Sequence, residues 1–164
     1  MFLNMLVPRY TVESVLNINL QELRSQGISG ILLDFDNTLL AWSDKVVSNE
    51  VIQWVKEALQ SGFQLCIVSN AEKSRLRTQA NILGIPYVSK ALKPGLSGIR
   101  RALKLMNLTK SEVTMVGDQM FTDVLAGNRA GLSTILVKPI FLKEQWWMRY
   151  VRKLENFIQK RLSF

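Results

Sequence analysis

The sequence predicts an α/β fold in which helices flank a parallel central sheet. Short, continuously apolar runs alternate along the chain with segments whose apolar residues recur every three or four positions. The first pattern is typical of strands covered on both faces and the second of amphipathic helices, so their alternation favours a parallel sheet. The chain has 164 residues, of which 48% are hydrophobic and 21% are charged, and it shows no repeat or linker. We therefore expect one domain over residues 1–164.

The individual elements follow from this pattern. Asn19 and Glu22 have the spacing of a capping box, and Gly27 ends the short helix that they begin. The first strong strand is expected over residues 28–35, and an amphipathic helix over residues 49–60 follows it. Further strands are expected at 63–68, 86–88, 113–116 and 134–137, with helices at 72–83, 96–106 and 122–129 between them.

The residue types present exclude several kinds of catalysis. The chain contains no histidine, which excludes Ser-His-Asp and Cys-His catalysis and every histidine-ligated metal site. Its one cysteine, Cys66, excludes an intramolecular disulfide framework and a cysteine-based zinc cluster. Any metal must therefore be bound by oxygen, which favours Mg²⁺ or Ca²⁺.

The charge balance predicts an anionic partner. With 21 Lys and Arg against 13 Asp and Glu, the net charge is +8, which suits a nucleic acid, an anionic membrane surface or a phosphorylated substrate. No apolar run approaches the ~20 residues that span a bilayer. The apolar start lacks the basic lead and cleavage site of a signal peptide. We expect a cytoplasmic protein, with peripheral membrane contact as an open alternative.

Polar residues end three of the expected strands, where parallel α/β sheets bind their ligands. They are Asp34 and Asp36, then Ser69 and Asn70, then Gly117 and Asp118. Asp123 adds a fourth carboxylate, and like charges this close repel one another unless a cation neutralises them. Mg²⁺ is the natural cation, because it uses one or two carboxylates and shares a phosphate oxygen. With Lys93 as a fixed positive charge, the set suits phosphoryl transfer through an aspartyl-phosphate.

Four ordered motifs resemble those of the haloacid dehalogenase (HAD) superfamily. They are DFDNTL at 34–39, SN at 69–70, KP at 93–94 and GDQMFTD at 117–123. The resemblance implies a Rossmann-like fold. By position, Asp34 resembles the nucleophile that attacks phosphorus, and Asp36 resembles the general acid and base. The Mg²⁺ ligands implied are Asp34, the main-chain carbonyl of Asp36, and Asp118.

The resemblance also implies roles for the other motif residues. Ser69 and Lys93 resemble the groups that hold the phosphoryl oxygens, with Asn70 close by. Thr38 and Asp123 are the expected supporting residues, and Asp123 resembles the acid that supports Lys93 or a metal-bound water. Dehalogenase members lack an acid at the position of Asp36, so this carboxyl group indicates an ester-cleaving phosphatase.

The motif spacing leaves no room for a cap domain. Residues 39–63 hold one helix with its connections, and residues 71–93 hold one helix and one strand. We therefore expect an open active site. An open site suits a large substrate that closes the cleft itself, or closure by a neighbouring subunit; the oligomeric state itself is not predicted.

The carboxyl-terminal segment, residues 141–164, is expected to form a basic amphipathic helix. Its net charge is +4, half of the charge of the chain, and Trp146 and Trp147 lie near its start. Such a helix is typical of anionic membrane interfaces. It is equally compatible with docking on the sheet, and its mix of aromatic and basic residues also suits single-stranded RNA.

The uncapped architecture, the DFDNTL motif and the chain length resemble the YqeG-type subgroup of HAD subclass IIIA. This subgroup is similar to the mitochondrial-type phosphatidylglycerophosphate phosphatases. The resemblance implies a Mg²⁺-dependent phosphomonoesterase that acts on an anionic phospholipid at the membrane face. Two alternatives stay open: a phosphatase of soluble sugar or nucleotide phosphates, and a basic RNA- or ribosome-associated module with a HAD-like shell.

Overall fold

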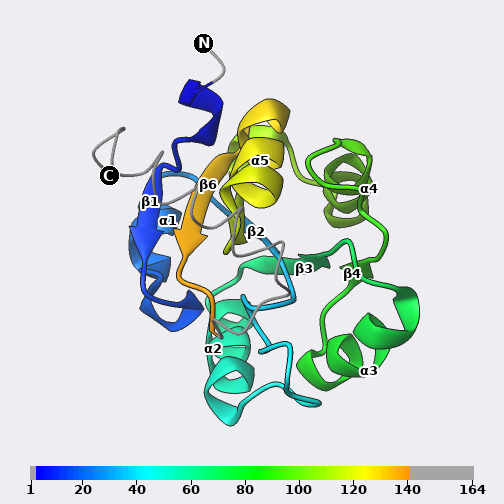
Figure 1. Cartoon of the computed structure of the whole chain (residues 1–164). Coiled ribbons are helices and arrows are strands. Elements are labelled where there is room, and N and C mark those ends of the chain that lie inside the picture. The colour runs from blue at the N-terminus through cyan, green and yellow to red at the C-terminus, as the bar shows by residue number, and fades with distance from the viewer. Residues whose placement is uncertain (1–2, 141–164) are drawn as a thin grey trace.

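A six-stranded, wholly parallel sheet forms the centre of the protein in the computed structural model, which describes residues 3–140 (Figure 1). The strand order across the sheet is β1-β6-β5-β2-β3-β4. The strands are β1 (Tyr10–Val12), β2 (Gly30–Leu33), β3 (Gln64–Val68), β4 (Tyr87–Val88), β5 (Val113–Gly117) and β6 (Ser133–Val137). The expected parallel α/β architecture is therefore confirmed.

Within residues 3–140, five α-helices connect and cover the strands. They are α1 (Leu20–Ser25), α2 (Asn49–Gln60), α3 (Lys73–Leu83), α4 (Ser97–Met106) and α5 (Leu125–Ala130). Short 3₁₀ turns lie at η1 (Leu3–Leu6), η2 (Val15–Asn17) and η3 (Lys110–Glu112), and η4 (Met120–Val124) is a π-helical turn. Apolar residues of α1, α2 and α3 pack in one core cluster with one face of the sheet, and those of α4 and α5 pack with the other. The sheet is thus covered on both faces.

Local sequence signals explain where the helices begin and end. The Asn19 side chain accepts a hydrogen bond from the Glu22 amide and caps α1, as the spacing predicts. Ser48 caps α2 in the same way through the Val51 amide. Gly84 ends α3 in the left-handed conformation, at φ 67°, which glycine adopts without steric cost.

Three elements differ from the sequence predictions. The sheet has a sixth strand, β1, which pairs in parallel with β6 at the sheet edge. The strand expected over 28–35 is shorter, because β2 spans Gly30–Leu33, and the chain turns after it at residues 37–39. The helix expected over 122–129 is α-helical only from Leu125, in α5, because residues 120–124 form the π-helical turn of η4.

The segments between the motifs carry no cap domain. The connection from β2 to β3 holds α2, and the connection from β3 to β4 holds α3, with no further helix or strand in either. The carboxyl ends of the strands are therefore not covered by an inserted domain within residues 3–140. The basic helix expected over residues 141–164 lies outside the described residues, so its docking place stays a prediction. No helix among residues 3–140 has both the length and the apolar content needed to cross a bilayer.

Candidate active site

Asp34 and Lys93 form the centre of a buried polar cluster at the carboxyl edge of the sheet. Asp34 directly follows β2, and its amide donates a hydrogen bond to the Val116 carbonyl of β5 over 2.8 Å. Lys93 comes from the loop between β4 and α4, and its Nζ lies 2.6 Å from Asp34 Oδ1 and 2.7 Å from Asp123 Oδ1. All three side chains are buried. Segments 59 and 30 residues apart in sequence are thus joined by two buried ion pairs.

Thr38 and Asp118 complete this cluster on the other side of Asp34. The Thr38 hydroxyl lies 3.4 Å from Asp34 Oδ2 and 3.4 Å from Asp118 Oδ1. It therefore has one carboxylate oxygen on either side and a single proton to donate. Thr38 and Asp118 are both buried, so these interactions are largely screened from water.

Gly117, the last residue of β5, makes room for Asp123. A Cβ atom at Gly117 would overlap the carboxylate of Asp123. The Gln119 amide donates to Asp123 Oδ2 over 3.1 Å, while Asp123 Oδ1 contacts Lys93. Both oxygens of Asp123 therefore have partners within the protein, and the glycine lets η4 hold the carboxylate against Lys93.

The charges of this cluster perturb one another and are perturbed by burial. Burial raises the pKa of Asp34 from 3.8 to about 7; the Lys93 charge opposes this rise and the Asp123 charge adds to it. Burial by itself would lower the pKa of Lys93, but attraction to Asp123 and Asp34 outweighs it and raises that pKa above its usual value. Lys93 is therefore positively charged at neutral pH. Its charge offsets only part of the cost of burying an ionised Asp34 carboxylate.

The donor set fits a divalent cation. Asp34, Asp118 and Asp123 each present a carboxylate oxygen, and these oxygens lie within 4.8 Å of one another. Three ionised carboxylates around the single ammonium group of Lys93 would leave a buried excess of two negative charges. An oxygen-only set with this excess suits Mg²⁺. Both oxygens of Asp123 are bonded within the protein, to Lys93 and to the Gln119 amide, which is consistent with the supporting role expected for this residue.

Ser69 and Asn70 form hydrogen bonds to the loop that carries Lys93, and the Ser69 carbonyl accepts from the Ala91 amide over 3.0 Å. Asn70 Oδ1 accepts from the Lys93 amide over 2.8 Å, and Asn70 Nδ2 donates to the Lys93 carbonyl over 3.1 Å. This two-way clamp holds the backbone of Lys93. Ser69 is buried, and its Oγ accepts from the Ala71 amide over 3.1 Å. Contact of either side chain with a phosphoryl group stays a prediction.

Asp36 has a cationic partner that the sequence analysis missed. Arg75, in α3, donates to Asp36 Oδ1 through Nε over 2.9 Å and through Nη2 over 2.8 Å. The Arg75 guanidinium also lies 5.0 Å from the centre of the Trp42 ring. The helical pattern of residues 72–83 places Arg75 near the carboxyl edge of the sheet. The pattern does not indicate which side chain Arg75 contacts there.

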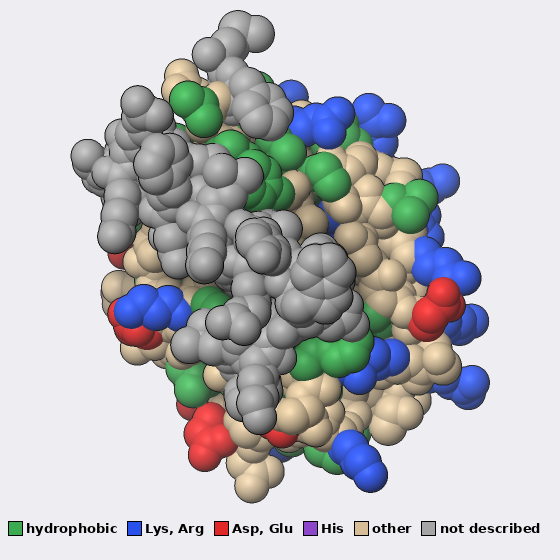
Figure 2. All heavy atoms as spheres, in the orientation of Figure 1, with side chains coloured by type: hydrophobic (Ala, Val, Ile, Leu, Met, Phe, Trp, Pro, Cys, Tyr) green, Lys and Arg blue, Asp and Glu red, His purple; other side chains and the backbone are tan. Residues whose placement is uncertain are grey.

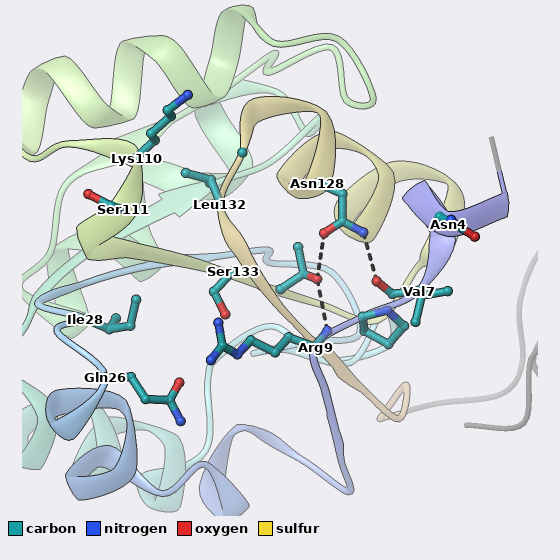
Figure 3. Close-up of a pocket in the computed structure, with 13 residues that line it drawn as sticks. Asn4, Val7, Arg9, Gln26, Ile28, Lys110, Ser111, Asn128, Leu132 and Ser133 are labelled. Carbon is teal, nitrogen blue, oxygen red and sulfur yellow. Dashed lines mark hydrogen bonds between the residues drawn. The ribbon is translucent and has the colours of Figure 1, made fainter. Parts of the chain in front are cut away.

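A hollow lies at the opposite edge of the sheet, where β2, β5 and β6 begin (Figure 3). Its volume is about 600 Å³, and Arg9, Gln26, Lys110, Ser111 and Ser133 are among its lining residues. Asn128 Nδ2 donates to the Val7 carbonyl there, and Arg9 bonds Thr134, so this region fastens the amino-terminal segment to β6. None of the predicted site residues lines it, so the Asp34 cluster is the stronger candidate for catalysis.

The surface formed by α4 is strongly basic. Arg100, Arg101 and Lys104 are exposed on this helix, which contains no acidic residue. Figure 2 shows Lys and Arg side chains along the side of the molecule where Figure 1 places α4 and α3. We call the three cations of this helix the α4 flank. Part of the net positive charge is therefore concentrated on one side of the described chain.

Comparisons with known proteins agree with this arrangement. A family model described as HAD-hydrolase-like matches residues 91–139. The probable phosphatase YqeG of Bacillus subtilis (strain 168) is 35% identical over 157 residues, which cover 96% of this chain and 91% of YqeG. The chloroplastic/mitochondrial phosphatidylglycerophosphate phosphatase 1 of Arabidopsis thaliana is 29% identical, over 94% of this chain and 47% of that protein.

Among solved structures, 3-deoxy-D-manno-octulosonate 8-phosphate phosphatase from Moraxella catarrhalis matches with a TM-score of 0.53 and 17% identity. The match covers 87% of this chain and 92% of that chain. At this identity it supports the fold alone. The match to nearly all of YqeG, together with the four motifs at one edge of the sheet, identifies the family. The chain belongs to the YqeG-type phosphatases of the haloacid dehalogenase superfamily.

Proposed function

We propose that this phosphatase is a Mg²⁺-dependent phosphomonoesterase that acts through an aspartyl-phosphate on Asp34. The observation behind the proposal is the buried cluster in which Lys93 contacts Asp34 and Asp123 while Asp118 lies beside them. Such a cluster provides a carboxylate nucleophile, a fixed cation and an oxygen-only cation site within one small volume.

In the first half-reaction, a carboxylate oxygen of Asp34 forms a bond to phosphorus. The bond between phosphorus and the ester oxygen breaks, and its electron pair stays on the leaving oxygen. Asp36, in its protonated form, donates its proton to that oxygen, so the product leaves as a neutral alcohol. The phosphoryl group is then bound covalently to Asp34.

In the second half-reaction, water attacks the phosphorus of the aspartyl-phosphate. Asp36, now ionised, accepts a proton from this water. The bond between phosphorus and the Asp34 oxygen breaks, which releases inorganic phosphate and restores the Asp34 carboxylate. Asp36 is restored to its protonated form, so the cycle is balanced.

The residues that would bind Mg²⁺ are Asp34, Asp118 and the main-chain carbonyl of Asp36. When bound, the cation supplies positive charge against the phosphoryl oxygens and favours the ionised form of Asp34. The raised pKa of Asp34 supports this assignment, because a nucleophilic carboxylate in this buried place needs compensating charge.

Lys93 and Ser69 are the proposed contacts of the phosphoryl oxygens. Lys93 keeps its charge and is anchored by Asp123, so it can stabilise negative charge that develops during transfer. Asn70 sets the Lys93 backbone through its two hydrogen bonds, and it adds a polar group at the same edge. Thr38 orients Asp34 and Asp118 toward each other.

For the physiological substrate we propose phosphatidylglycerophosphate at an anionic membrane. The Arabidopsis thaliana relative bears the name of this activity. The open carboxyl edge suits a substrate that is held by a surface, and the α4 flank adds charge that is complementary to anionic lipid. Peripheral contact through residues 141–164 belongs to the same proposal.

The direct test compares wild-type protein with Asp34→Asn on three substrates: an aryl phosphate, a panel of soluble sugar and nucleotide phosphates, and phosphatidylglycerophosphate in mixed micelles. Wild-type turnover that is lost in the folded variant supports the mechanism. Higher kcat/KM for the lipid than for every soluble ester supports the substrate. A preference for a sugar or nucleotide phosphate would replace the lipid proposal and leave the mechanism standing.

A further inference from the structure

Arg75 and Trp42 form a cationic and aromatic surface next to Asp36. The guanidinium lies 5.0 Å from the centre of the Trp42 ring and 5.9 Å from that of Phe35. Trp42 is 55% exposed, so part of its ring is accessible to solutes. The Arg75 and Asp36 side chains are 32% and 20% exposed, so water and solutes reach this pair.

A buried scaffold holds this surface in place. Gln79 lies one helical turn after Arg75 on α3 and is buried. It accepts a hydrogen bond from the Val47 amide over 3.1 Å and donates one to the Lys45 carbonyl over 2.8 Å. These bonds fasten to α3 the loop that bears Trp42. The loop is therefore positioned before any substrate arrives.

The Arg75 guanidinium has donors available for a second anion. A guanidinium has five N–H groups in a planar fork. The Asp36 carboxylate accepts from two of its nitrogen atoms, and the Arg75 side chain forms no other hydrogen bond to the described residues. Arg75 can thus bind a further anion while its pair with Asp36 persists, and stacking on Trp42 limits its rotation.

We propose that Arg75 and Trp42 form a subsite for a second anionic group, carried by the leaving alcohol of the substrate. The proposal rests on the proposed function, because Asp36 donates its proton to the leaving oxygen and the rest of the alcohol therefore passes Asp36. Arg75 is the cation bonded to Asp36 on that path. The subsite selects phosphomonoesters whose alcohol also bears a phosphodiester, over esters of uncharged alcohols.

A phosphodiester is the chemistry that this subsite fits. Its two unesterified oxygens match the planar donors of a guanidinium, and the Trp42 face accommodates the carbon chain beside it. A phospholipid head group and its water-soluble, deacylated form present this same chemistry. The subsite therefore recognises the head group itself and acts independently of any contact with acyl chains.

The test measures kcat/KM for glycerol 3-phosphate and for deacylated phosphatidylglycerophosphate, in which the glycerol of the monoester also carries a phosphodiester. The ratio of the two values isolates recognition of the second anion. For the wild-type protein we expect the deacylated diester to be preferred. Arg75→Gln should reduce this ratio about 10- to 100-fold, as expected for loss of a charge-assisted hydrogen bond. Arg75→Lys should retain part of it, and Trp42→Ala should reduce it less.

Arg77→Gln is the matched control, since it removes the same charge from an exposed position on the same helix. It should leave the ratio unchanged. A further experiment uses phosphatidylglycerophosphate in neutral detergent micelles. If Arg75→Gln lowers kcat/KM equally for this lipid and for the deacylated compound, the recognition lies at the head group. A loss confined to the micellar lipid would contradict the subsite and point to a surface contact.

The outcomes separate this inference from the proposed function. If Arg75→Gln lowers kcat/KM equally for both soluble compounds, the pair with Asp36 only positions Asp36, and the subsite is wrong while the mechanism stands. The same holds if the wild-type protein shows no preference between the two. If wild-type protein hydrolyses an aryl phosphate but neither glycerol compound, the proposed lipid substrate and the proposed subsite are both wrong.

Discussion

Replacing Gly117 by alanine perturbs the site through a single methyl group. The added Cβ would overlap the Asp123 carboxylate, which is buried and bonded to the Gln119 amide and to Lys93. Asp123 must therefore move, or β5 must shift at its carboxyl end. Either change lengthens the contact of 2.7 Å between Asp123 Oδ1 and Lys93 Nζ.

The size of the effect follows from two terms. Overpacking a buried position by a methyl group costs about 1–3 kcal/mol of folding free energy. A catalytic group displaced by about 1 Å loses about 10²-fold in rate. We therefore expect Gly117→Ala to lower kcat for an aryl phosphate about 100-fold while the protein remains folded.

The assay pairs this variant with Gly127→Ala as a control. A Cβ at Gly127 would press on the Thr134 and Met115 side chains, so this substitution also overpacks a buried contact, but it touches none of the site residues. Both variants should unfold at a lower temperature, and only Gly117→Ala should lose most of its kcat. Wild-type kcat in folded Gly117→Ala, or an equal loss in Gly127→Ala, would refute the anchoring role of Asp123.

The remaining predictions address the metal, the acid, the charge of Asp34 and the membrane. EDTA should abolish turnover, Mg²⁺ should restore it and Ca²⁺ should not, because Ca²⁺ prefers more ligands and looser geometry; full activity without metal would contradict the site assignment. Asp36→Asn should lower the rate of hydrolysis more for alkyl phosphates than for aryl phosphates, since aryl leaving groups need little protonation. Equal losses of rate for the two classes would argue against the acid role of Asp36. The unfolding free energy of metal-free wild-type protein, measured relative to Asp34→Asn, should fall as pH rises from about 4 through 7. Burial raises the pKa of Asp34 from 3.8 to about 7, so the folded state holds this proton more tightly than the unfolded state does. A rise in the unfolding free energy over the same pH range would contradict a raised pKa of Asp34. Deleting residues 141–164 should weaken binding to anionic liposomes and spare turnover of a soluble aryl phosphate, whereas joint loss of stability and activity would support the alternative of a docked helix.

The convergence of the site residues could be predicted because it follows from topology. Asp34, Ser69 and Asp118 each lie at the carboxyl end of a strand, and because these strands pair in parallel their carboxyl ends lie at one edge of the sheet. The contact of Lys93 with Asp34 is consistent with the expected fixed cation beside the nucleophile. These features depend on the strands being parallel, which the alternation of apolar runs predicts.

Other features depend on side-chain packing that periodicity does not encode. β1 is a three-residue edge strand that pairs with β6 alone, and so short a segment has no distinctive pattern. The partner of Asp36 depends on which residue of α3 faces the loop after β2, and the helical repeat leaves Arg75 unmarked. The hydrogen bonds of Asn70 to the backbone of Lys93 were also not predicted, and its place near the phosphoryl group stays a prediction.

The identity of the nucleophile is tested most directly by trapping the covalent intermediate. Wild-type protein is mixed with an aryl phosphate and Mg²⁺, quenched in acid and reduced with borohydride, which converts an aspartyl-phosphate into homoserine. Mass spectrometry of the resulting peptides then locates the modified residue. The proposed mechanism predicts homoserine at position 34 and none in the Asp34→Asn variant. Modification of a different residue, or steady turnover with Asp34 never modified, would contradict it.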